Sequence, residues 1–230
     1  MKTLLLLCLI PAMLFAADFP LEDFSSYSIG DDIDDSADWD RDDEGEYFLI
    51  EEYSGDNVLV LDNYATNGLY AGYSCDGGGV WLDGLVNMDF RFSGDDSYFA
   101  LTTRAFNDVA YIAGIKIIAA PIAMAFTAII DGSGSYTELS TAALSNVSAN
   151  TWHSLSFEIS GTDPVDLTLY LNGTEVTSHS DPTYLYPAGW AGFGAAYEYD
   201  IAYIYADNFS INDYSVAVEE TTFGEIKAMF

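Results

Sequence analysis

Acidic side chains crowd one stretch near the start of the chain, and their spacing suits a divalent cation. Asp38, Asp40 and Asp42 alternate as the first ligands of an EF-hand-type calcium loop do. The match then stops, because Asp43 stands where the turn glycine belongs and Leu49 where the bidentate glutamate belongs. Two interpretations stay open: a loop that binds calcium, and a solvated acidic loop that binds no metal.

Aromatic residues form a second set of candidates. Sugar rings stack on aromatic faces, while carboxylates and amides take the sugar hydroxyls. Tyr184, Tyr186 and Trp190 cluster with Asp181 in a predicted loop, and Trp81 follows three glycines. Loops carry binding residues more often than regular elements do. We therefore predict that Trp190, Tyr184, Tyr186 and Asp181 contact a ligand, with Trp81 as a second candidate.

A third set of aromatics has a less specific meaning. The spacing of Tyr197, Tyr199, Tyr203 and Tyr205 places them on one face of a strand, either as core or as a binding platform. Trp152 and Phe157 are predicted to lie in the core.

Composition excludes several functions. The chain has few Lys and Arg residues and a formal net charge of −31. Binding to phosphate groups needs clustered Lys and Arg, so no nucleic acid is expected as a partner. His153 and His179 are the two histidines, and neither belongs to a zinc-ligand spacing or a Ser/Cys nucleophile arrangement. Apart from any calcium ligands, the acidic residues indicate a solvated extracellular surface.

The first residues predict secretion. Lys2 precedes an apolar run over 4–15, and small residues follow at 16–17, which is the layout of a signal peptide with cleavage after Ala16. We predict a secreted or cell-surface protein without a further membrane span. Removal of residues 1–16 leaves Cys75 as the single cysteine, so no internal disulfide is expected.

Short strands with turn residues between them dominate the rest of the chain. They are predicted over residues 46–52, 58–62, 68–74, 86–92, 98–105, 110–119, 123–130, 135–140, 152–160, 165–171, 174–179, 189–197 and 201–211. Asn172-Gly173 is a strong hairpin signal between two of them. Lys116 and Pro121 interrupt the apolar run 109–130, which favours two buried strands over a membrane span. The fold class is all-β, a two-sheet antiparallel sandwich, with a linker and short helix or tail over 213–230.

Two segments carry a family resemblance. Residues 151–159 (TWHSLSFEI) and 167–176 (LTLYLNGTEV) resemble the concanavalin A-like lectin/glucanase superfamily, in which laminin-G-like jelly rolls have a similar hairpin. Residues 21–27 and 206–211 are similar to the first and last strands of such domains, so one jelly-roll domain is expected over 17–212. The resemblance implies two antiparallel sheets, one of them curved, with glycans bound on the concave face or the rim.

The resemblance also implies two specific sites. Glucanases of the superfamily carry E-x-D-x-x-E, and Glu198 and Asp200 match its start, although Tyr203 replaces the second glutamate. Many members hold a structural calcium between the first and last strands, which here assigns Asp207 together with Glu22 or Asp23.

We therefore predict a secreted, non-catalytic module that binds a polysaccharide or surface glycan, with a structural Ca²⁺ ion. One alternative is a glycoside hydrolase of the same fold, which needs two carboxylates close together in the concave groove. The other is a structural or envelope protein that self-assembles and has no aromatic-lined groove.

Overall fold

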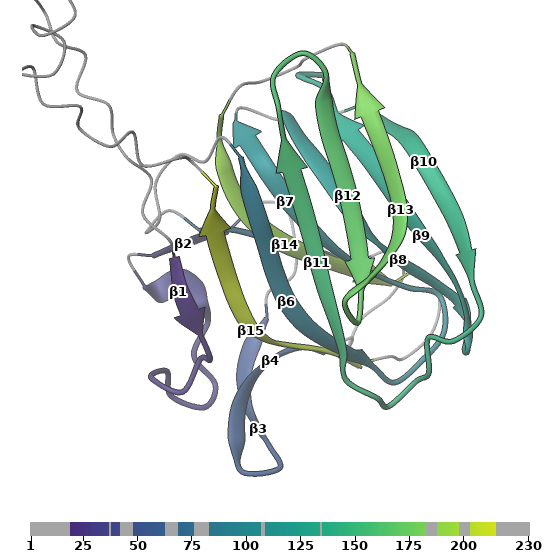
Figure 1. The fold of residues 1–230 in the computed structure, drawn as a ribbon. Helices are drawn as coiled ribbons and strands as arrows, with labels where there is room; N and C mark the ends of the chain where they lie inside the picture. Colours follow the sequence, from purple (N-terminus) through teal and green to yellow (C-terminus); the bar gives the residue numbers. More distant parts are fainter. Residues whose placement is uncertain are drawn as a thin grey trace, which may run out of the picture.

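The chain folds as two β-sheets packed face to face (Figure 1). The structure is a computed structural model that describes residues 19–36, 38–41, 48–62, 69–75, 83–106, 109–133, 135–182, 188–197 and 203–214. Both sheets are antiparallel throughout, which confirms the predicted sandwich. The predicted signal peptide and the predicted terminal helix lie outside the described residues.

Within the described residues, sheet A has eight strands in the order β13-β12-β11-β6-β15-β4-β3, with β1 also paired to β15. Its members are β1 (Phe19–Glu22), β3 (Leu49–Tyr53), β4 (Asp56–Asp62), β6 (Gly84–Phe92), β11 (His153–Ser160), β12 (Val165–Leu171), β13 (Thr174–Asp181) and β15 (Tyr203–Asp213).

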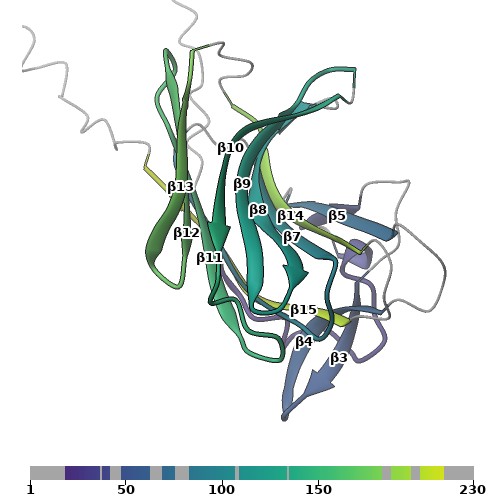
Figure 2. The same cartoon turned by 90° about the vertical axis from the view of Figure 1, so that its right-hand side faces the viewer.

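In the part of the chain that the structure describes, sheet B has seven strands in the order β10-β9-β8-β7-β14-β5-β2. Its members are β2 (Trp39–Arg41), β5 (Leu69–Cys75), β7 (Ser97–Phe106), β8 (Val109–Ala119), β9 (Ile122–Ile130), β10 (Tyr136–Leu144) and β14 (Trp190–Tyr197). Strands β7 to β10 bend, and their hollow side faces away from sheet A (Figure 2). The curved sheet expected from the resemblance is therefore sheet B.

Strand positions follow the alternation of apolar residues. Leu155, Phe157 and Ile159 are buried while the residues between them are more exposed, and β12 spans the predicted 165–171. Most other strands differ from prediction by a few residues at their ends. The apolar run 109–130 forms β8 and β9 with a turn at 120–121, as expected for two strands. No helix in the described part of the chain has the length and apolar character needed to cross a membrane.

The acidic stretch near the start is more ordered than the sequence suggested. A 3-10 turn, η1 (Ile33–Asp35), and β2 occupy part of it, and both place an apolar side chain in the core. Ile33 is fully buried, and Trp39 packs against Phe209 with ring centroids 4.9 Å apart. The prediction of a loop was thus wrong for this part, because the side chains of Ile33 and Trp39 pack into the hydrophobic core and fix the backbone there.

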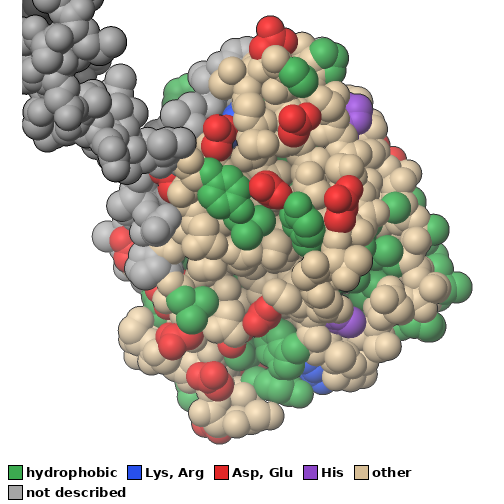
Figure 3. Space-filling model, in the orientation of Figure 1, with side chains coloured by type: hydrophobic (Ala, Val, Ile, Leu, Met, Phe, Trp, Pro, Cys, Tyr) green, Lys and Arg blue, Asp and Glu red, His purple; other side chains and the backbone are tan. Residues whose placement is uncertain are grey.

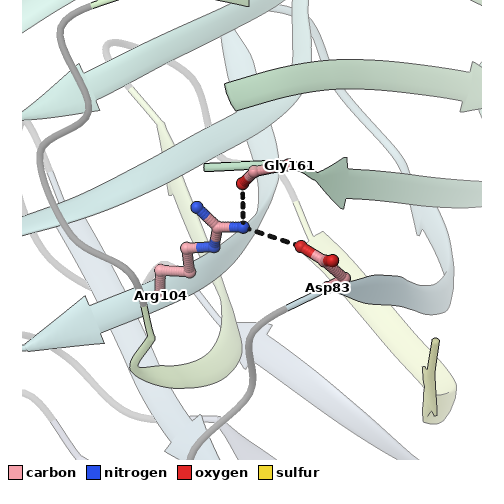
Figure 4. Close-up of polar contacts among 3 residues, drawn as sticks. All are labelled: Asp83, Arg104 and Gly161. Carbon is pink, nitrogen blue, oxygen red and sulfur yellow. Dashed lines mark hydrogen bonds and ion pairs between the residues drawn. The ribbon is translucent and has the colours of Figure 1, made fainter. Parts of the chain in front are cut away.

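One buried cation connects the two sheets. Arg104 of β7 is completely buried, and its Nη2 donates to Asp83 Oδ1 at 2.9 Å and to the Gly161 carbonyl at 2.8 Å (Figure 4). Asp83 precedes β6, and Gly161 follows β11, so sheet B is tied to two connections of sheet A. The charge of Arg104 is compensated by a carboxylate, which a buried guanidinium requires.

Candidate functional site

The hollow outer face of sheet B carries a groove with aromatic walls. We call it the sheet B groove; its cavity is about 220 Å³, and its lining comprises Tyr98, Lys116, Met124, Phe126, Tyr136 and Glu138. These side chains face outward because their strand neighbours face the core: Phe99 beside Tyr98, and Ile115 and Ile117 beside Lys116. Four adjacent strands, β7 to β10, thus contribute to one surface.

Ring contacts shape the walls of this groove. The Lys116 ammonium lies 4.6 Å from the Tyr98 ring centroid, a cation–π contact between β8 and β7. The rings of Phe126 and Tyr136 meet edge to face, with centroids 6.3 Å apart. Tyr136 remains 50% exposed, so part of its ring is open to a ligand.

The hydroxyl of Tyr136 is held in its neutral form. Burial raises its pKa to about 12, and the nearby Glu138 carboxylate and the Tyr98 phenol add to the rise. At neutral pH the phenol is protonated, as an ordinary tyrosine is, and it can donate a hydrogen bond as well as accept one. A phenol beside a carboxylate offers both kinds of partner that sugar hydroxyls need.

Beside the walls, the outer face has a floor of small residues. Gly194, Ala100 and Gly114 pair across β14, β7 and β8 in one row, and the row ends at Phe126 of β9. A side chain at Gly114 would meet the Phe99 carbonyl oxygen and the Ala100 methyl group, so the backbones approach closely there. The three small residues of the row carry no side chain larger than a methyl group, and Gly114 and Gly194 are themselves buried.

Trp190 lies at another end of this sheet. It begins β14, is partly exposed, and has its ring centroid 5.7 Å from that of Phe106, itself 44% exposed. Its neighbours Tyr184 and Tyr186, and the predicted Trp81, lie outside the described residues. Trp190 therefore remains a predicted ligand contact.

The predicted role of Asp181 in ligand binding is wrong. Its side chain is only 2% exposed, and its Oδ2 accepts a hydrogen bond from the Tyr111 hydroxyl at 2.9 Å inside the sandwich. The carboxylate is thus a partner of a core phenol and does not form part of a ligand-binding surface. Its position at the end of β13 explains the error, because the sequence placed it in a loop.

Two expectations about aromatics are also wrong. Trp152 was expected in the core, yet it is only partly buried and meets Tyr53 at 6.2 Å on the outer face of sheet A. Tyr197 ends β14 in sheet B, whereas Tyr203 and Tyr205 lie on β15 in sheet A, so the tyrosines share no single strand face. Tyr199 lies outside the described residues.

The expected calcium ligands of the first and last strands come near one another. Phe209 of β15 pairs with Glu22 of β1, so Asp23 comes near Asp207. The pKa of Asp207 is raised to about 7, mainly by burial and further by Asp56, Asp89 and Asp23, against the opposing Asn208 backbone N–H. These neighbouring carboxylates repel one another, and a bound cation would reduce the repulsion.

The same carboxylates already have hydrogen-bond partners. Glu22 Oε1 accepts from the Phe24 backbone N–H at 2.8 Å, and Asp23 Oδ1 accepts from the Ser25 hydroxyl at 2.6 Å. Within the described residues, no group of three or more His, Cys, Asp or Glu side chains is arranged to hold a metal ion. Calcium binding stays a prediction.

The remaining predicted site residues divide in two. Asp38 and Asp40 are exposed on either side of buried Trp39, at the edge of sheet B. Asp42, Glu198 and Asp200 lie outside the described residues. Among the described residues that line the sheet B groove, Glu138 is the one carboxylate.

The residues of the sheet B groove were missed at the sequence level. The interpretation of 109–130 as buried strands left no outer face to examine. Lys116 was the available signal, because a lysine inside an apolar strand marks the side that faces water.

Comparison with solved structures identifies the architecture. A glycosidic hydrolase has a TM-score of 0.59 at 13% identity, covering 87% of this chain and 98% of that one. A β-glucanase of Bacillus licheniformis has 0.56 at 12%, covering 85% and 98%. The fold is a concanavalin A-like jelly roll.

A carbohydrate-binding module, CBM66 of Bacillus subtilis, shares this jelly roll with a TM-score of 0.53 at 14% identity. The match covers 74% of this chain and 92% of that module. No family profile and no curated protein matches the sequence at a significant level. At such identities the likeness establishes the jelly roll alone, because one fold hosts many unrelated functions.

Proposed function

We propose that this chain is a secreted, non-catalytic carbohydrate-binding module that holds a neutral polysaccharide in the sheet B groove. The observation that carries the proposal is the groove itself: aromatic rings line it, and a row of small residues lies beside it. Stacking on exposed rings suits the apolar faces of sugars, and the Tyr136 hydroxyl and Glu138 carboxylate suit their hydroxyl groups.

Charge restricts the polysaccharide. A formal net charge of −31 repels polyanionic glycans, and Lys116 is already engaged with the ring of Tyr98. A neutral chain avoids this repulsion. The predicted signal peptide at 1–16 supports a location outside the cell or at its surface, where a protein can encounter polysaccharides.

Two alternatives make different demands. Glycoside hydrolysis of the usual kind needs a pair of carboxylates about 5 Å or more apart across the bound sugar. Among the described residues that line the sheet B groove, Glu138 would provide one carboxylate of such a pair, and no second carboxylate is found there. A self-assembling envelope protein was expected to lack an aromatic-lined groove, and the sheet B groove counts against it.

The test is a glycan array probed with residues 17–230, with and without EDTA. We expect binding to neutral polysaccharide fragments, and loss of binding in EDTA would support the predicted structural calcium. Absence of binding under both conditions would overturn the proposal. Release of reducing sugar from a bound polysaccharide would replace it with the hydrolase alternative.

A matched pair of variants places the ligand. Tyr136→Ala removes a half-exposed ring from the groove, whereas Tyr203→Ala removes a 37%-exposed ring from sheet A. We expect the first to weaken binding about fivefold and the second to leave it unchanged, since one stacked ring contributes about 1 kcal/mol.

A further inference from the structure

A second cavity lies on the opposite side of the sandwich, on the outer face of sheet A. We call it the sheet A pocket; its volume is about 510 Å³, and its lining comprises Tyr53, Ser54, Asp56, Val58, Asp89, Trp152, Asp207 and Asn208. The residues come from β3, β4, β6 and β15 and from the positions just after β3 and before β11. On this face, acidic side chains lie among apolar ones and greatly outnumber basic ones (Figure 3).

Two aromatic rings form one wall of the pocket. Trp152 and Tyr53 meet edge to face with an interplanar angle of 74°, and both are partly exposed. The ring system already holds a cation beside the pocket: the Arg91 guanidinium lies 4.8 Å from the ring centroids of Tyr53 and Tyr205. Indole and phenol faces attract cations, and tryptophan does so most strongly.

The rest of the lining is polar and has both acceptors and a donor. Asp56, Asp89 and Asp207 supply carboxylates, and the Asn208 side-chain amide donates to Asp89 Oδ2 at 3.1 Å. No Lys or Arg is among the described residues that line the cavity. The carboxylates therefore repel an anionic ligand, whereas a ligand with a positive group and several hydroxyls finds partners among the rings and the polar groups of the lining.

The geometry points to a second glycan site in the sheet A pocket, specific for a sugar that carries a free amino group. The sugar ring lies against Trp152 and Tyr53, its ammonium group faces Asp56 and Asp89, and its hydroxyls meet Ser54 and Asn208. This site does not depend on the sheet B groove, because the two lie on the outer faces of different sheets.

Calorimetric titration with three ligands tests the inference. The probes are a chitosan oligosaccharide, its N-acetylated counterpart and a cello-oligosaccharide of the same length, at mildly acidic pH in EDTA. We expect the chitosan fragment to bind at least about tenfold more tightly than the other two. We also expect its affinity to fall as salt is added, since the attraction between charges is screened.

Variants separate this site from the sheet B groove. Trp152→Ala changes a partly buried side chain and Asp56→Asn an exposed one, and we expect each to weaken chitosan binding about tenfold or more. Tyr136→Ala is the matched control, because it removes a ring from the other face and should leave chitosan binding intact. Circular dichroism of each variant confirms that the fold persists.

Several results would overturn the inference. Equal affinity for the chitosan fragment and its acetylated counterpart would remove the role of the ammonium group. Chitosan binding that survives Trp152→Ala but is lost in Tyr136→Ala would assign the ligand to the sheet B groove. Absence of chitosan binding both with and without EDTA would also reject it, whatever neutral glycans the sheet B groove binds.

Discussion

Asp207 lies directly opposite Asp89 across the β6–β15 ladder, and one amide group lies between their carboxylates. The Asn208 Nδ2 donates to Asp89 Oδ2 at 3.1 Å and approaches Asp207 Oδ2 at 3.4 Å. Like charges opposite each other destabilise a sheet, and the donor reduces that cost. Asn208 can reach both because it sits in a bulge of β15 with φ of 58°, a conformation that asparagine tolerates.

The bridging amide of Asn208 should therefore contribute to stability. Asn208→Gly keeps the positive φ but removes the donor, and we expect it to lower the free energy of unfolding by about 1–2 kcal/mol. Asn208→Ala should cost about 1 kcal/mol more, because alanine is strained at positive φ. Urea unfolding at neutral pH measures both. An Asn208→Gly variant as stable as the parent would mean that the amide does not relieve the repulsion.

The raised pKa of Asp207 predicts a pH dependence. Its folded-state pKa of about 7 lies above the ordinary value of 3.8, so the folded state binds this proton more tightly than the unfolded state. The stabilisation is complete below about 3.8 and is lost as pH rises through about 7. In Asp207→Asn this loss should disappear.

The measurement is the difference in unfolding free energy between the parent and Asp207→Asn from pH 4 to pH 8, in EDTA. Other carboxylates titrate in both proteins, and the difference isolates Asp207. A difference that stays constant across this range would contradict the raised pKa.

Arg104 and Asp83 provide a prediction about the link between the sheets. Arg104→Met fills the volume but leaves the Gly161 carbonyl without its donor and Asp83 without its cation. Asp83 is 38% exposed and stays hydrated, so the cost should be about 2–3 kcal/mol rather than the larger values of fully buried pairs. Arg104→Lys keeps the positive charge at this position, so its loss of unfolding free energy should be smaller. Equal losses would show that packing, not charge, matters at this position.

Much of the fold could be predicted because alternation is a local property. The segment from 152 to 176 reads directly as two strands and an Asn-Gly turn, and β11, β12 and β13 follow it closely. Strand β2 could not be predicted in this way, since three residues are too few to show a period. Its place in sheet B depends on the burial of Trp39 against side chains distant in the sequence.

The candidate sites were harder to predict, because each combines strands that only pairing brings together. Tyr98, Lys116 and Met124 become neighbours through the β7–β8–β9 register, which no single segment encodes. The prediction that Trp152 lies in the core was wrong for a reason that the strand pattern explains. The alternation that buries Leu155 and Phe157 assigns even-numbered positions to the outer face, and Trp152 belongs to that face.

The contrast between Trp39 and Trp152 leads to a direct test of where each ring lies. Trp39 is 3% exposed and contacts Phe19, Phe193 and Phe209, so Trp39→Ala should lower the free energy of unfolding by about 3–5 kcal/mol. Trp152→Ala removes a ring that is only partly buried and should cost about 1 kcal/mol. Thermal and urea unfolding of the two variants, side by side, measure the contrast. Comparable losses would return Trp152 to the core and remove the aromatic wall of the sheet A pocket.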